Sequence, residues 1–151
     1  MYQRIMVPLD GSELAQTALP HALELCRACG ATLVLIYVRD PRLGSEEAAW
    51  RYLDFVRDEH VDQGVPIELV VREGPVGATI IQAAEDQRID VIVMATHGRS
   101  GLQRVVYGSV AEQVLRGSSK PVLLVRVPGS TVELPEGMTG PHHRTLPAEP
   151  A

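Results

Sequence analysis

The sequence predicts an α/β protein, an open and doubly wound parallel five-stranded sheet with helices on both faces. Five short runs within residues 1–127 are apolar at nearly every position, which is typical of strands buried on both sides. The segments between these runs carry apolar residues three and four positions apart, which is typical of amphipathic helices. Strands that alternate with helices in this way favour a parallel sheet covered on each face.

Turn and capping residues divide the first half of the chain. An apolar run ends at Asp10-Gly11, a favoured turn sequence, and Ser12 can cap the helix that follows. The apolar stripe of that helix ends at Gly30, because glycine favours the left-handed conformation that often follows a helix. A second stripe ends at Gly64. We expect strands at residues 4–9 and 32–38 and helices at residues 14–30 and 48–64.

The second half of the chain shows the same alternation. In Ser109-Val110-Ala111-Glu112 a hydroxyl and a carboxylate have the spacing of a capping box, so a helix is expected to begin at Ser109. Pro121 is acceptable at the start of a strand, where its missing N–H matters least. We expect strands at residues 66–71, 90–95 and 122–127 and helices at residues 77–87 and 109–117.

Composition limits the classes of function. Lys and Arg are scattered among the acids, the net charge is -5, and the chain has one Phe and one Trp. These features argue against a basic stripe or an aromatic platform for nucleic acid. No apolar run is long enough to cross a membrane, and the N-terminus reaches Asp10 too early for a signal peptide. We therefore expect a cytoplasmic protein with neither a nucleic-acid nor a membrane partner.

The character of the chain changes after Val127. Residues 128–151 contain five prolines and three glycines, few large apolar residues and no helical or strand period. We expect one domain at residues 1–127 and a disordered tail at residues 128–151. His142 and His143 lack the further ligands that a metal site needs, so we interpret them as a solvated pair.

A polar loop and a helix start form the candidate site. The strand at residues 90–95 leads into the loop at residues 96–101, and Gly108 precedes the helix at Ser109. The first N–H groups of a helix attract anions, and nearby glycines let a ligand approach the backbone. This pattern predicts a phosphate site. Ordinary helix capping at Ser109, and an ordinary turn at Asp10-Gly11-Ser12, remain alternative interpretations.

Three segments together resemble the universal stress protein family: VPLDGS (residues 7–12), MATHGRSG (residues 94–101) and GSVAE (residues 108–112). The resemblance extends from residue 1 to about residue 127. Nucleotide-binding members of that family carry Gly-x-x-Gly, nine residues, then Gly-Ser or Gly-Thr. This chain carries Ala95-x-x-Gly98, nine residues, then Gly108-Ser109. The departure adds one methyl group where the backbone would approach ribose or phosphate.

The resemblance implies a Rossmann-like sheet of strand order 3-2-1-4-5, with a reversal between the first and fourth strands. Ligands bind at such a reversal, outside the carboxyl ends of the strands. The implied ligand is an adenine nucleotide, ATP or ADP or AMP with or without Mg²⁺, which regulates a stress-response protein acting on an unknown signalling partner. The expected nucleotide contacts are Pro8, Asp10, Val38, Ala95, Thr96, His97, Gly98, Arg99, Ser100, Gly101, Gly108, Ser109, Val110 and Ala111.

Within this site, Asp10 or its neighbouring backbone is expected to meet the adenine or ribose, and the Val38 backbone to meet the ring edge. Arg99 is expected to contact phosphate. Two other functions stay open. In a slow ATP hydrolase His97 would act as acid or base, although neither a Walker lysine motif nor a Gly-x-Ser-x-Gly elbow is present. In a dimeric interaction module the change to Ala95 would have abolished nucleotide binding.

Cys26 and Cys29 match the Cys-x-x-Cys pattern, which allows redox chemistry or half a zinc site. Both fall near the end of their predicted helix, where the helix dipole opposes a thiolate, and the chain has no other cysteine. We therefore interpret both as buried structural thiols.

The last strand, residues 122–127, lies at the end of the implied strand order. It carries one charge, Arg126, among five aliphatic residues. An apolar edge with unpaired backbone groups is usually covered, and the same strand of a second copy would cover it. The tail is the alternative cover, but its prolines lack the N–H groups that this needs. We expect a homodimer through residues 122–127, in agreement with the dimers that the family resemblance implies.

Overall fold

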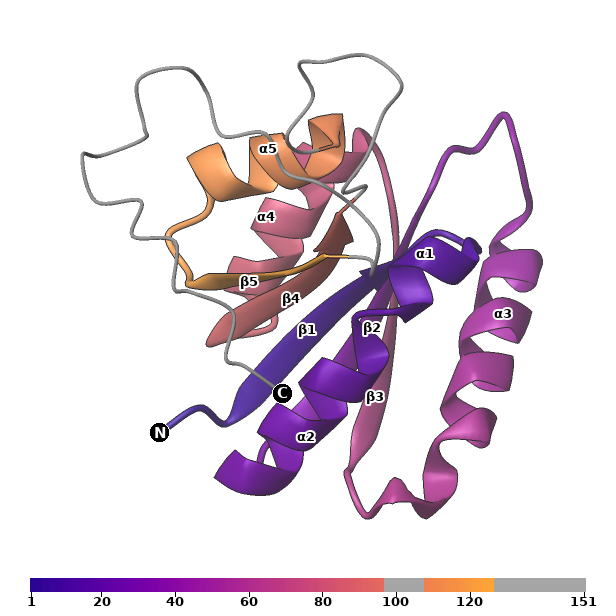
Figure 1. The fold of residues 1–151 in the computed structure, drawn as a ribbon. Helices are drawn as coiled ribbons and strands as arrows, with labels where there is room; N and C mark the ends of the chain where they lie inside the picture. The colour runs from indigo at the N-terminus through magenta and orange to yellow at the C-terminus, as the bar shows by residue number, and fades with distance from the viewer. Residues whose placement is uncertain (97–107, 127–151) are drawn as a thin grey trace, which may run out of the picture.

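The structure, a computed structural model, describes residues 1–96 and 108–126. Its five strands form one parallel sheet of order β3-β2-β1-β4-β5 (Figure 1), which confirms the predicted fold class and strand order. β1 lies at the centre of the sheet, and β5 is an edge strand. The strands are β1 (Arg4–Leu9), β2 (Thr32–Arg39), β3 (Ile67–Glu73), β4 (Val91–Thr96) and β5 (Val122–Arg126).

Helices cover both faces of the sheet (Figure 1). Apolar residues of α2 and α3 pack on one face, and apolar residues of α4 and α5 pack on the other, so each face has its own core. Alternate residues of each strand contribute to the two cores, as the pleat of a strand requires. The helices are α1 (Glu13–Gln16), α2 (Leu19–Cys29), α3 (Glu46–Glu59), α4 (Val76–Asp86) and α5 (Ser109–Gly117), with one 3-10 turn, η1 (Val61–Gln63).

The single helix expected at residues 14–30 is wrong, because the structure has two helices there. α1 ends at Gln16, where the N–H and the hydroxyl of Thr17 both donate to the Leu14 carbonyl. Pro20 explains the break: it lacks an N–H for the Gln16 carbonyl, and its ring would collide with that carbonyl in a continuous helix. In the first turn of α2 the same proline is acceptable. Gly30 ends α2 in the left-handed conformation, as expected.

The helix expected at residues 48–64 is also altered. α3 begins two residues earlier, since Ser45 is its N-cap and accepts a hydrogen bond from the Ala48 N–H at 3.1 Å. It ends at Glu59, and the chain then tightens into η1 before the left-handed Gly64. The remaining predicted boundaries lie within two residues of the observed ones, apart from Val127, which lies outside the described residues.

The two cysteines lie on the inner side of α2. Cys26 is buried in the core, and this burial raises the pKa of its thiol to about 11. Cys29 is only half-buried, so the expectation of two buried thiols is right for Cys26 and wrong for Cys29. Both thiols are free, and a thiol with such a raised pKa is a weak nucleophile at neutral pH.

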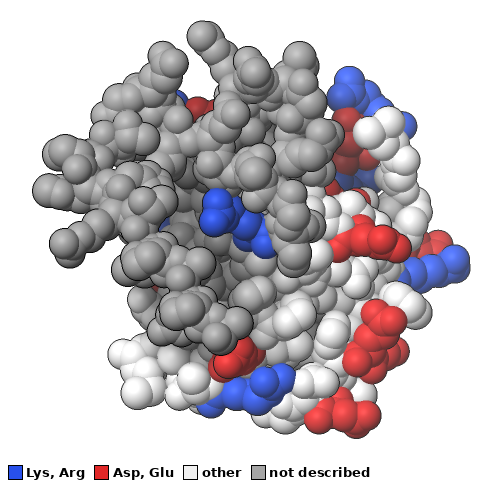
Figure 2. All heavy atoms as spheres, viewed as in Figure 1, with Lys and Arg blue, Asp and Glu red and all other residues white. Residues whose placement is uncertain are grey.

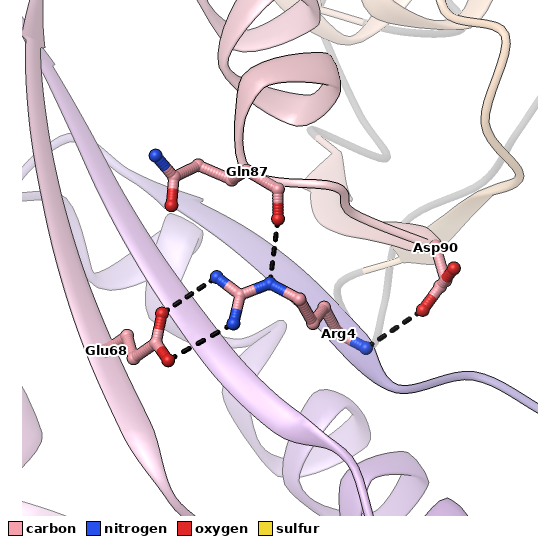
Figure 3. A network of polar contacts seen from close by, with 4 residues as sticks. All are labelled: Arg4, Glu68, Gln87 and Asp90. Atoms are coloured by element: carbon pink, nitrogen blue, oxygen red, sulfur yellow. Dashed lines mark hydrogen bonds and ion pairs between the residues drawn. The ribbon is translucent and has the colours of Figure 1, made fainter.

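A polar network closes the amino-terminal edge of the sheet (Figure 3). The Arg4 guanidinium donates to both carboxylate oxygens of Glu68 on β3, at 3.1 and 2.7 Å, and to the carbonyl of Gln87 beyond α4 at 2.7 Å. One carboxylate oxygen of Asp90 accepts the backbone N–H groups of Gln3 and Arg4, at 2.8 and 3.0 Å. The network therefore joins the starts of β1 and β4 to β3 and to the end of α4.

Charges on the described surface lie mostly in pairs. Figure 2 shows acidic and basic side chains beside one another on the described part of this face rather than in a continuous basic stripe. Ion pairs of the described residues include Arg51 with Glu47 and Arg57 with Asp54. In residues 1–96 and 108–126 no helix has the length and apolar character needed to cross a membrane. The predicted tail at residues 128–151, with His142 and His143, lies outside the described residues.

Asp90 provides a test of the edge network. The Gln3 backbone N–H, together with that of Arg4, holds the pKa of the Asp90 carboxyl below its usual value. Because the folded pKa is the lower one, the carboxylate stabilises the fold above its unfolded-state pKa, and this stability is lost as the pH falls through the folded value. We expect Asp90→Asn to lower the free energy of unfolding by about 1 kcal/mol at pH 7, and by much less near pH 3.

Urea unfolding at the two pH values measures this difference. Asp62→Asn is the matched control, since the Asp62 carboxylate accepts no hydrogen bond from a described residue. An equal loss of stability at both pH values for Asp90→Asn would contradict the assignment.

Candidate functional site

The candidate site is a crevice at the carboxyl-terminal edge of the sheet. It has a volume of about 300 Å³ and is lined by the ends of β1, β2 and β4 and by the first residues of α1, α4 and α5. The crossovers diverge between β1 and β4, since β2 and β3 lie to one side of β1 and β4 and β5 to the other. The crevice therefore lies at the strand reversal that the family resemblance implied.

The predicted contacts divide into two groups. All those that the structure describes line this one crevice, although they come from four separate segments of the chain. The rest of the predicted set, His97, Gly98, Arg99, Ser100 and Gly101, lies outside the described residues. The residues brought together are Pro8, Asp10, Val38, Ala95, Thr96, Gly108, Ser109, Val110 and Ala111.

Sequence reasoning missed further lining residues. Ser12 is expected to cap the next helix and, with the rest of residues 8–12, to flank the crevice, but it is not among the expected contacts, and Met94 is interpreted only as part of a buried strand. Val76 and Ile80 could have been found through the turn before α4, whose start faces the crevice, but no motif marks them. The lining residues absent from the prediction are Leu9, Ser12, Leu14, Ala15, Val76, Ile80 and Met94.

The loop after β1 is held by its own polar groups. Asp10 Oδ1 accepts the Ser12 N–H at 2.9 Å and the Ser12 hydroxyl at 2.5 Å. The Ser12 hydroxyl in turn accepts the Ala15 N–H at 3.1 Å, which confirms Ser12 as the N-cap of α1. Asp10 is exposed, and its Oδ2 accepts no hydrogen bond from the described residues. That oxygen is available to accept a hydrogen bond from a ligand hydroxyl or amine.

The capping box predicted at the start of α5 is wrong. Gly108 is the N-cap, with φ -60° and ψ 154°, and Ser109 is the first helical residue. The Glu112 carboxylate does not reach back, because it pairs with Arg116 at 2.8 Å on the outer side of the helix. No side chain of the described residues caps the helix, and residues 108–111 line the crevice, so the positive end of the helix and its first N–H groups lie beside the crevice.

Ala95, the departure from the family motif, lies on β4 between Met94 and Thr96, whose side chains lie on the opposite face of the sheet from its own. The Ala95 side chain packs against the core beneath α2, whereas Met94 belongs to the core beneath α4 and α5. The extra methyl group is therefore directed away from the face that carries the start of α5.

Tyr52, on α3, forms hydrogen bonds with the segment that follows β1. Its hydroxyl accepts a hydrogen bond from Gln16 Nε2, at the end of α1, at 3.2 Å, and its ring meets the edge of Tyr37 with 5.7 Å between centroids. Burial raises the pKa of the Tyr52 hydroxyl, and the hydrogen bonds from Gln16 and from the Gly11 backbone oppose that rise. Tyr52 thus joins α3 to the turn that carries Asp10.

The described lining of the crevice is mostly apolar, with a few polar side chains. Asp10 is its one charged residue, and its other polar side chains are the hydroxyls of Ser12, Thr96 and Ser109. In the described residues no three His, Cys, Asp or Glu side chains gather as metal ligands would. Uncapped helix N–H groups, hydroxyls and apolar walls suit a ligand with an anionic group and an apolar ring.

Comparisons with known proteins agree with one another. The model of the universal stress protein family matches residues 1–126. The universal stress protein MJ0531 of Methanocaldococcus jannaschii is 33% identical over 143 residues, covering 85% of this chain and 84% of that protein. The universal stress protein MJ0577 of the same organism is 28% identical, covering 83% of this chain and 96% of that protein.

Two solved structures are similar in fold and sequence. The structure of the hypothetical protein MJ0577 has a TM-score of 0.74 and 30% identity, and covers 86% of this chain and 99% of its own. A universal stress protein in complex with cAMP has a TM-score of 0.70 and 25% identity, and covers 83% of this chain and 97% of its own.

Tyr52→Phe tests the support of the loop. Removing the hydroxyl deletes the hydrogen bonds from Gln16 and from the Gly11 backbone but keeps the ring packing, so the free energy of unfolding should fall by about 1 to 2 kcal/mol. Tyr37→Phe is the control, because the Tyr37 hydroxyl makes no hydrogen bond to a described residue while its ring makes the same contact. Denaturant unfolding measures both variants, and equal stabilities for the two would refute this role of Tyr52.

Proposed function

The chain belongs to the universal stress protein family, and from this premise we propose that its crevice binds an adenine nucleotide, ATP or its shorter phosphates, as a regulatory ligand in the stress response. The observation that carries the proposal is the convergence of Pro8, Asp10, Val38 and the start of α5 on one crevice. A similar protein of known structure holds cAMP, which supports the choice of an adenine nucleotide.

The phosphates would lie at the start of α5. No side chain of residues 1–96 or 108–126 caps the N–H groups of the first turn, and a side chain at Gly108 would meet open space. The first helical N–H groups and the helix dipole together favour an anion there. The Ser109 hydroxyl adds a donor at the same place.

The nucleoside would lie against β1 and β2. Pro8 and Val38 offer apolar surface and backbone groups to a flat ring, and Oδ2 of Asp10, to which no described residue donates, can accept a hydrogen bond from ribose or the base. Ala95 lines the crevice, but its side chain packs on the face of the sheet opposite to the start of α5, so its methyl group leaves the proposed phosphate position free.

We propose that the crevice binds the nucleotide without hydrolysing it rapidly. The described lining holds no lysine or histidine and only one carboxylate, which already accepts two hydrogen bonds from Ser12. A slow hydrolase that relies on His97 and Arg99 is the second candidate, and phosphate release from ATP and Mg²⁺ separates it from a pure binder.

Titration calorimetry with ATP tests the site. Ser109→Ala should weaken binding about ten- to a hundredfold, because it removes a hydrogen bond to a charged group worth about 1.5 to 3 kcal/mol. Ser119→Ala, beyond the far end of α5, is the control and should bind as the wild type does. Gly98→Val should abolish binding if the backbone of the loop approaches the phosphates.

Ala95→Gly examines the family departure directly. Affinity equal to that of the wild type is expected, since the methyl group packs away from α5. Tighter binding would show that the methyl group hinders the ligand. No binding in either form would favour the interaction module without nucleotide.

We also propose that β5 pairs with its copy in a second chain to form a homodimer. β5 is a sheet edge, and Leu123 is 43% exposed on it. The Ile92 N–H donates to the Pro121 carbonyl at 3.0 Å, so in a parallel ladder the backbone groups of Val122, Leu124 and Arg126 point away from β4. An antiparallel second copy would satisfy these outward groups.

Leu124→Pro tests this interface. The substitution deletes an outward N–H and leaves the bonds to β4 in place, so the variant should fold and dimerise more weakly. Leu124→Ala shortens the side chain but keeps the N–H, and serves as the control. Light scattering measures the mass of each variant, of the full chain and of a version ending at Val127. A monomeric full chain would refute the dimer, and a monomer only in the short version would assign the contact to residues 128–151.

A further inference from the structure

Thr96, the last residue of β4, carries a buried hydroxyl with unused hydrogen-bonding capacity. The residue is 2% exposed, and its Oγ1 has no hydrogen-bond partner among the described residues. Buried polar atoms in folded proteins are paired in the great majority of cases. An unpaired hydroxyl destabilises the fold, and such a group calls for an explanation in terms of function.

The position of Thr96 supplies that explanation. Thr96 lines the crevice, together with the first residues of α5. Along β4 it follows Met94 by two residues, and Met94 packs in the core with Ala111 of α5. Because strand side chains alternate, Thr96 faces the same side of the sheet as the start of α5. The unpaired hydroxyl and the uncapped helix N–H groups therefore converge on one part of the crevice.

The chemistry of threonine suits a group that pairs only with a ligand. Rotation about its Cα–Cβ bond exchanges the positions of methyl and hydroxyl, so Oγ1 can turn toward the crevice without a change in the backbone. A hydroxyl can donate to a phosphate oxygen, and the helix start beside it favours the same anion.

We propose that Thr96 Oγ1 donates a hydrogen bond to a phosphate oxygen of the nucleotide held at the start of α5. This inference rests on the proposed nucleotide-binding function. Without a ligand, the buried hydroxyl has no described partner and lowers the stability of the protein. With nucleotide bound, it gains a hydrogen bond that stabilises the complex.

Thr96→Val tests the inference with two readouts of opposite sign. Valine keeps the shape of the side chain and removes the hydroxyl, so the affinity for ATP should fall by about tenfold or more. The melting temperature of the empty protein should stay the same or rise, because an unpaired polar atom has been removed from the interior. A hydroxyl with a purely structural role would give the reverse, a lower melting temperature with unchanged affinity.

Two further variants make the comparison sharper. Thr96→Ser keeps the hydroxyl and should bind ATP within a few-fold of the wild type. Thr32→Val makes the same chemical change at the first residue of β2, at the amino-terminal ends of the strands and far from the crevice. It should leave the affinity for ATP unchanged. Loss of affinity in Thr32→Val as well would overturn the specific role of Thr96.

The ligand series ATP, AMP and adenosine, titrated into the wild type and Thr96→Val, identifies the group that is contacted. We expect the variant to lose affinity for ATP and AMP and to bind adenosine as the wild type does. An equal loss for adenosine would overturn the phosphate assignment in favour of ribose. Equal affinities of wild type and variant for all three ligands would overturn the role of Thr96 and leave the proposed function standing. A wild type that binds none of the three would overturn both.

Discussion

The position of β1 between β2 and β4 determines the rest of the architecture. Its central residues Ile5, Met6 and Val7 have no exposed surface, since strands flank them on both sides and helices cover both faces. The chain leaves β1 toward β2 and later returns to its other side as β4, so the crossovers diverge at its carboxyl end. The turn that follows β1 therefore opens into a crevice, and the residues of that turn become lining residues.

Polar groups are paired at the amino-terminal ends of the strands, whereas several at the carboxyl-terminal ends have no partner among the described residues. At the amino-terminal edge Arg4, Glu68 and Asp90 hold one another and the nearby backbone in a network of charge-assisted hydrogen bonds. At the carboxyl-terminal edge no described residue pairs with Oδ2 of Asp10 or with the buried hydroxyl of Thr96, and no described side chain caps the start of α5. Polar groups are satisfied where the fold is held together and remain available where a ligand is expected, as binding sites require.

The altered glycine motif shows why a sequence departure must be considered with its geometry. From the motif alone, the methyl group of Ala95 stands where backbone and ligand meet. On β4 the side chain packs toward the core beneath α2, while Met94 and Thr96 face α5. The start of α5 depends instead on its close packing with α4, where Gly77 leaves space for the Gln113 side chain. The position of that helix matters more for an anion site than one methyl group on the opposite face.

Local patterns in the sequence were enough to predict the five strands, the cap at Ser12, the left-handed Gly30 and the helix start at Ser109, because propensity and periodicity act within a few residues. The strand order, and the meeting of nine expected contacts at one crevice, also followed once the family resemblance supplied the winding. Two of the missed features have local causes: Pro20 breaks the first helix, and Glu112 pairs with Arg116 four residues along α5 instead of forming a capping box. Tertiary structure alone brought Tyr52, Val76 and Ile80 to the site. These outcomes depend on contacts between segments far apart in the chain, and such contacts exist only when the helices have packed on the sheet.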